Sequence, residues 1–318
     1  MNTLKTMNQF LCKIPSPLAG LALAIASLGL SWENVADLDG AAQGLGALLA
    51  GVILIPLFLK FIMNPVILKQ ELQHPVASSV IPTLTMATMV VANAISHIYF
   101  QLGLAISWFA IILQFCFFAT FIFYRSKHFN LKQVLPSWFI PPIGLVLAIV
   151  THPGGLPTIL SNSILILGLL SYAVLLPIIL YRLFSSDTLD NNLKPIITII
   201  ATPASLLIVA YLVAVSEIHL LLFGLLLFVA IVMTLYVYTI LPSLLRLPFS
   251  PTYSAFTFPL VVGAIALFKS AQLLLQEGVD MKWVSLMIQL ANIELIIATA
   301  MVIYVSFSFI KHLCLIKN

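Results

Sequence analysis

The chain has 318 residues, of which 62% are hydrophobic and only 8% are charged. Soluble domains carry about 25% charged residues, so this chain has too few charges to cover a water-facing surface. Apolar runs close to the ~20 residues that span a bilayer as a helix recur from end to end. The composition therefore excludes a soluble globular protein and predicts an all-α polytopic membrane protein, with one transmembrane domain over 1–318.

The apolar runs predict ten transmembrane helices joined by short connections. An even number of crossings places both termini on the same side of the membrane. Helix boundaries read from a sequence are good to a few residues. The predicted helices cover 16–32, 41–63, 76–100, 102–124, 135–150, 158–184, 195–215, 218–241, 250–270 and 282–310.

The distribution of basic residues agrees with ten helices. Of the 14 Lys and Arg residues, all but Lys269 and Lys282 fall on the side of the termini. Because loops rich in Lys and Arg remain in the cytoplasm, we expect a multi-pass protein of the inner or plasma membrane with both termini cytoplasmic. A wrong helix count would have scattered these charges over both sides.

Prolines mark every second predicted helix at intervals of about 60 residues, the length of one helical hairpin. Small and hydroxyl side chains accompany these prolines, whereas the intervening helices are mostly bulky and apolar. The period predicts five helical hairpins in a quasi-fivefold arrangement. The five prolines are Pro17, Pro82, Pro142, Pro203 and Pro259.

Proline kinks a helix and frees a backbone carbonyl, which inside a bilayer must be satisfied by protein or by cavity water. We therefore expect five proline-kinked helices inside, around a central pore, and the five bulky helices toward lipid. The alternative is that membrane helices tolerate proline and pack through small residues. The predicted pore-lining residues are Pro17, Gly20, Pro82, Thr83, Thr85, Pro142, Gly144, Pro203, Ser205, Thr257, Pro259 and Gly263.

Four short stretches resemble a known family. They are Pro-Leu-Ala-Gly-Leu-Ala-Leu-Ala at 17–24, His-Pro-Val at 74–76, Ser-Trp-Phe-Ile-Pro-Pro-Ile-Gly at 137–144 and Phe-Thr-Phe-Pro at 256–259. Together they resemble the tellurite-resistance/dicarboxylate transporter family, which includes the plant slow-type anion channels and a bacterial tellurite-resistance protein. The resemblance implies ten helices as five hairpins, a pore through each protomer and a homotrimer.

The resemblance also implies a phenylalanine that plugs the pore. Phe256 and Phe258 are two residues apart, about 200° around a helix, so both cannot face a pore. Periodicity leaves the choice open, as it leaves open ordinary packing of either ring. The family pattern implies Phe258 as the gate.

The predicted inner helices contain no Asp, Glu, Lys or Arg at mid-depth. Such groups usually mark proton relays and ion-coupled sites. A neutral path with hydroxyls and one aromatic ring suits weak binding, from which an ion can leave. Lys269, near the external end of its helix, either attracts anions or extends its amine to the membrane surface.

Glu294 is the one acid deep in a predicted helix, and that helix lies outside the proposed pore. A charged residue at a helix centre costs roughly 3 kcal/mol on insertion scales. We therefore expect its carboxyl to be neutral or hydrogen-bonded, with Gln289 or Asn292 as partners. The sequence leaves open a structural role and a proton-linked role.

Three functions remain: a passive channel for small inorganic anions, a proton-coupled carrier of C4-dicarboxylates such as malate, and a tellurite-resistance or efflux protein. No nucleotide-binding, metal-binding or catalytic motif is present. We therefore expect no enzymatic activity, no cofactor, no metal and no nucleic-acid partner. The expected partners are the transported anion, the lipid bilayer and further copies of the chain.

Overall fold

The computed structural model describes residues 2–36, 38–127, 129–185 and 189–317, and every regular element in these ranges is helical. Among the described residues, eight helices are long and apolar enough to cross a membrane, or nine if the bent pair Met7–Lys13 and Leu18–Trp32 is one span. The segment predicted at 135–150 is the shorter apolar helix Pro136–Thr151. Each predicted helix thus has a helical counterpart, while the count of ten crossings stays a prediction.

Burial alternates along the chain. In the proline-bearing spans 77–96, 194–214 and 251–276, 72 to 83% of the apolar stretch is buried, whereas in the long helices between and around them the share is 22 to 39%. The buried, inner segments are α2 (Leu18–Trp32), α5 with α6 (Ala77–Val80, Thr83–Ser96), η2 with α8 (Pro136–Phe139, Ile140–Thr151), η3 with α10 (Lys194–Ala201, Thr202–Ala214) and η4 with α12 (Pro251–Phe256, Phe258–Gln276). The outer helices are α3 (Ala41–Met63), α7 (Phe100–Lys127), α9 (Thr158–Ser185), α11 (Leu220–Leu244) and α13 (Met281–Lys317).

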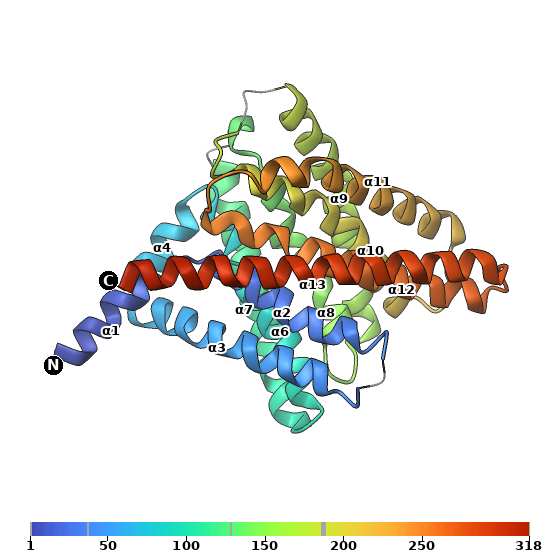
Figure 1. Ribbon diagram of the computed structural model, residues 1–318, viewed down its shortest axis with the longest axis horizontal. Helices are drawn as coiled ribbons and strands as arrows, with labels where there is room; N and C mark the ends of the chain where they lie inside the picture. The colour runs from blue at the N-terminus through green and yellow to red at the C-terminus, as the bar shows by residue number, and fades with distance from the viewer. Residues whose placement is uncertain (1, 37, 128, 186–188, 318) are drawn as a thin grey trace.

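The inner helices form a closed ring of contacts. Helix α2 packs on α6, α6 on α8, α8 on α10 and α10 on α12, and α12 returns to α2. Each outer helix lies over the junction of two inner ones: α3 over α2 and α6, α7 over α6 and α8, α9 over α8 and α10, α11 over α10 and α12, and α13 over α12 and α2. Figure 1 shows α13 running along the length of the molecule, with its C-terminal end and α1 (Asn2–Lys13) at the same end.

The prolines stand at the first turn of the inner α-helices and do not kink their middles. Pro17 and Pro82 are the N-cap residues of α2 and α6, and Pro203 and Pro259 lie within the first two positions of α10 and α12. Short helical pieces precede these turns, and α1 meets α2 at 80°. The first N–H groups of a helix have no partner within it, so proline costs little there. The expected kink is therefore a break between two helical pieces.

The carbonyl that Pro259 leaves free is satisfied from a neighbouring inner segment. Ala255, four residues before Pro259, accepts a hydrogen bond of 2.6 Å from the Thr198 hydroxyl of η3. The same hydroxyl lies 2.9 Å from the carbonyl of Pro195. Thr198 thus joins the breaks of two adjacent inner segments.

The structure also contains three short helices that the sequence analysis did not predict: α1, α4 (Pro65–Gln73) and η1 (Leu131–Gln133). A buried lysine connects α3 with α4 and the start of α2. Lys60 Nζ lies 2.8 Å from Glu71 Oε1, 2.9 Å from Ser16 Oγ and 3.0 Å from the carbonyl of Ile14. Since Lys60 is only 2% exposed, these three contacts replace the water it loses.

Side chains also tie α3, α6, α7 and α8 together at the opposite end. The Asn93 amide donates to the carbonyl of Thr151 at 2.9 Å and accepts from Gln43 at 2.7 Å. His152 Nδ1 lies 2.8 Å from the Ser107 hydroxyl, and burial lowers the pKa of this imidazole. The end of α8 is thereby fixed beside α6 and α7.

Replacing Lys60 with Met should lower the unfolding temperature. Removing one partner of a buried ion pair costs about 3–5 kcal/mol, and we expect the lower end because the Glu71 side chain is 21% exposed. Thermal unfolding of the purified protein in detergent measures the change. Lys69→Met, on the exposed face of α4, is the matched control, and equal unfolding temperatures for both variants would contradict the role of Lys60.

Thr198→Val keeps the shape of the side chain but leaves the carbonyl of Ala255 without its donor. An unsatisfied buried acceptor costs about 1–3 kcal/mol, so the unfolding temperature should fall. The Thr239 hydroxyl bonds only to its own helix and is exposed, so Thr239→Val is the control. No difference between the two valine variants would show that the Pro259 break is stable without Thr198.

Candidate functional site

A cavity of about 50 Å³ lies within the ring of inner helices. The first turn of every inner α-helix, or the residue just before it, contributes to the cavity wall. Because each of these helices starts at a break, the five starts meet at one level. The lining residues at these starts are Pro17, Thr83, Ile140, Thr202, Pro203, Phe258 and Pro259.

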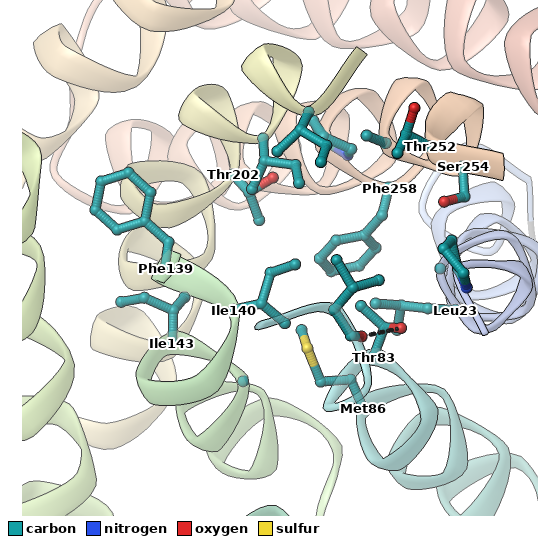
Figure 2. A pocket seen from close by; sticks show the side chains of 18 of the residues that line it. Leu23, Thr83, Met86, Phe139, Ile140, Ile143, Thr202, Thr252, Ser254 and Phe258 are labelled. Atoms are coloured by element: carbon teal, nitrogen blue, oxygen red, sulfur yellow. Dashed lines mark hydrogen bonds between the residues drawn. The ribbon is translucent and has the colours of Figure 1, made fainter. Parts of the chain in front are cut away.

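Phe258 fills the centre of the cavity. Figure 2 shows its ring extending from the start of α12 toward Leu23, Met86 and Ile140, which belong to three other inner helices. Phe258 is 7% exposed. Its ring therefore lies between apolar side chains of the other inner helices.

Phe256 takes a different position, as the spacing of the two rings requires. It ends the 3-10 segment η4, is 1% exposed, and packs against Tyr253 with ring centroids 4.8 Å apart. It is absent from the cavity wall. Of the two rings that the sequence left as candidates, Phe258 is the one in the cavity.

The polar groups of the cavity are hydroxyls. Thr83 Oγ1 donates to the carbonyl of Val80 at 2.8 Å, and Ser254 Oγ donates to Pro251 at 3.3 Å; Thr202 and Thr252 add two more hydroxyls. No Asp, Glu, Lys, Arg or His is among the described residues that line this cavity. The first N–H groups of the inner α-helices largely bond to the pieces that precede them, as those of Gly20, Ile140 and Thr202 do. The polar character of the cavity therefore comes mainly from its hydroxyls.

A wider vestibule of about 850 Å³ adjoins the cavity and shares Pro17, Val80 and Thr252 with it. Its charged side chains are Lys132, Arg182 and Asp190, and His74 also lines it. The loop around η1 is fixed from both sides by outer helices. Two arginines make these contacts: Arg182 Nε donates to the carbonyl of Lys132 at 3.3 Å, and Arg125 donates to Gln133 Oε1 at 3.4 Å and to the carbonyl of Gln73 at 2.6 Å.

Of the twelve residues expected to line the pore, six lie in the wall of this cavity: Pro17, Gly20, Thr83, Gly144, Pro203 and Pro259. Thr257 is fully buried and donates to the carbonyl of Ser254 at 2.7 Å. Pro142 lines a separate hollow with Trp138, Phe118 and Phe121. Pro82 begins α6 behind the cavity wall.

Thr85 lies outside the cavity wall and bonds to Gln114 of the outer helix α7. Sequence reasoning did not identify Gln114. The Thr85 hydroxyl donates to Gln114 Oε1, and Gln114 Nε2 donates to the carbonyl of Pro141 at 3.0 Å. Gln114 is fully buried. The Gln114 amide in the middle of an otherwise apolar helix is the sequence signal that could have identified this link between α6 and α8.

The remaining two expected residues, Ser205 and Gly263, line a second cavity of about 160 Å³ together with Glu294. Glu294 is 6% exposed and its Oε1 has no hydrogen-bond partner among the described residues. Gln289, one of its expected partners, lies on the exposed surface instead. The Tyr238 hydroxyl, also without a partner there, lines the same cavity.

Lys269 lies apart from all of these cavities. Its amine donates to Gln272 Oε1 at 3.2 Å on the same helix. The side chain is half-buried. It lies within α12, before the last two turns of the helix, and is not part of the candidate site.

Comparison with known proteins identifies relatives over most of the chain. Two proteins of Methanocaldococcus jannaschii, each named an uncharacterized transporter, are similar to it. One is 30% identical over 244 residues, which is 68% of this chain and 70% of the relative. The other is 29% identical over 270 residues, 75% of this chain and 76% of the relative.

A family model, described as voltage-dependent anion channel (SLAC1), matches residues 17–310. This range includes all five inner segments and the break at Pro17. The match confirms the resemblance stated from the four sequence stretches, and channels and transporters, not enzymes, make up the family. The chain is a multi-pass membrane protein and belongs to the SLAC1 family of voltage-dependent anion channels.

Proposed function

We propose that this protein is a passive channel for small inorganic anions, with its path through the ring of inner helices and Phe258 as the gate. The observation that carries the proposal is the meeting of five helix starts around one cavity that has hydroxyls but no ionisable side chain among its described lining. The absence of acidic side chains among the described lining residues favours anions over cations. A neutral lining binds anions weakly enough for release.

The proposal counts ten crossings, with Pro136–Thr151 among them. Four 3-10 residues and twelve α-helical residues give this segment a length of about 26 Å, close to the ~30 Å of a hydrocarbon core. Its start follows η1, to which the end of α7 bonds through Arg125 and Gln133, and its end meets the first turns of α7 at Ser107. It therefore runs beside α7 from end to end.

Selectivity in this proposal arises from dehydration. Phe258, Leu23, Met86 and Ile143 offer no hydrogen bond to a passing ion, so the ion must lose part of its water shell. Large, weakly hydrated anions lose water at the least cost and should pass best. Nitrate should therefore carry more current than chloride.

The same proposal places the protein in the cell membrane as a homotrimer, with both termini in the cytoplasm. The excess of Lys and Arg on the side of the termini supports the orientation. The trimer rests on the family resemblance. The vestibule bordered by Lys132 and Arg182 would then be the cytoplasmic entrance.

A proton-coupled carrier of C4-dicarboxylates is the second candidate. Glu294 favours it, because a buried carboxyl within the membrane can take up and release a proton. The residue lines a cavity separate from that of Phe258. This separation favours the channel, since a coupling proton usually binds next to the substrate.

Phe258→Ala should open the path. In planar bilayers with asymmetric chloride, we expect the native protein to conduct little and the variant to carry at least tenfold more current, larger again in nitrate. The reversal potential should approach that of the anion. Phe256→Ala is the matched control, an aromatic of the same region outside the cavity, which should lower thermal stability without raising current. A conducting Phe256→Ala with a silent Phe258→Ala would reject this gate.

Glu294→Gln should leave the current and its pH dependence unchanged from the parent protein, when both are measured in the Phe258→Ala background. Liposomes containing the native protein should not accumulate malate under an imposed proton gradient. If malate does accumulate, and Glu294→Gln abolishes the accumulation, the carrier replaces the channel as the function of this protein.

A further inference from the structure

The cavity beside Glu294 has the size of a small organic molecule. It lies between α10, α11, α12 and α13 and measures about 160 Å³. An apolar cavity of roughly 150 Å³ accommodates benzene, so this one can hold a ligand of about six to eight non-hydrogen atoms. Most of its wall is aliphatic, with Leu227, Ala230, Ala266 and Ile297 among the lining residues.

Two polar atoms at the cavity are buried without a partner among the described residues: Oε1 of Glu294 and the hydroxyl of Tyr238. No Lys, Arg or His is among the described lining residues that could pair with the acid. A carboxylate buried without a partner is costly. A ligand that brings a positive charge and hydrogen-bond donors would remove that cost.

The position of the carboxyl depends on Gly263 of α12. A Cβ atom at this position would overlap the Glu294 carboxyl, so only glycine lets the acid lie directly against the α12 backbone. The carboxyl is therefore held at one wall, while the remaining space stays open beside it. Gly263 lies one helical turn beyond Pro259, which places this cavity next to the gate helix but outside the candidate pore.

The cavity is open toward the lipid. Ile231 and Leu235 of α11, with Leu290 and Ile293 of α13, line it and are themselves between 38 and 58% exposed. On helices that face the bilayer, such exposure means contact with acyl chains. A ligand can therefore enter from the membrane if it dissolves there in an uncharged form.

We propose that this cavity binds a small lipid-soluble primary amine with an apolar body of about six carbon atoms. The neutral amine enters from the bilayer and takes the proton of the Glu294 carboxylic acid, which gives an ammonium paired with the carboxylate. Tyr238, which lines the same cavity, donates or accepts a hydrogen bond beside the pair. The site is independent of the proposed ion path.

Cyclohexylamine and cyclohexanol test the proposal, because they share a ring and differ in the ionisable nitrogen. Binding to the purified protein in detergent is measured by titration calorimetry. The native protein should bind cyclohexylamine at least tenfold more tightly than cyclohexanol. Glu294→Gln should lose this preference but still bind cyclohexanol, whereas Glu277→Gln, an exposed acid, should retain the native preference.

A variant that fills the space separates the cavity from other apolar sites. Ala230→Leu places extra volume in the cavity wall and should abolish binding of both ligands, whereas Ala105→Leu, on the exposed face of α7, should not. Equal affinity of the amine for the native protein and Glu294→Gln would overturn the proposal. So would the absence of saturable binding to the native protein, or binding unchanged in Ala230→Leu.

Discussion

A broken helix inside a bilayer must find hydrogen-bond partners within the protein, and this requirement governs the arrangement of the inner segments. At the start of α12 the partner is Thr198, which bonds to the carbonyl that Pro259 leaves free. Gln114 of α7 adds a second bond between segments, since it accepts from Thr85 of α6 and donates to the carbonyl of Pro141 in the first turn of α8. These bonds hold neighbouring segments side by side, in keeping with the ring of contacts that the inner helices form.

In the proposed channel, the ring would form the path of the ion in a chain with few charges. The described residues that line its cavity include hydroxyls but no lysine or arginine. The charged residues Lys60 and Glu71 lie instead at the edge, where they bond to each other and to the start of α2. The described lining of the central cavity is thus without charged side chains, and the Lys60–Glu71 ion pair lies at the edge.

The sequence predicted the hairpin period, the alternation of proline-bearing and bulky helices, and one helix, 41–63, to the residue. It did not predict how each inner helix is rotated. These helices are apolar or small on every side, so no polar face indicates which residues line a cavity; Ser205 and Gly263 accordingly lie beside Glu294 and not at the site. The sequence predicts kinks at the prolines because proline removes a backbone donor, but it does not indicate that a separate helical piece ends just before each inner α-helix.

The closure of the ring also has a consequence for biosynthesis. The last inner helix contacts the first, and Trp32 Nε1 of α2 donates to Thr299 Oγ1 of α13 at 3.2 Å. A ribosome delivers these partners at opposite ends of translation, so α2 waits in the membrane with one flank open until nearly the whole chain has been inserted. During that interval lipid or the insertion machinery must cover the exposed side of α2. A chain interrupted before α12 would have an incomplete ring of inner helices, and cellular quality control would be expected to degrade it.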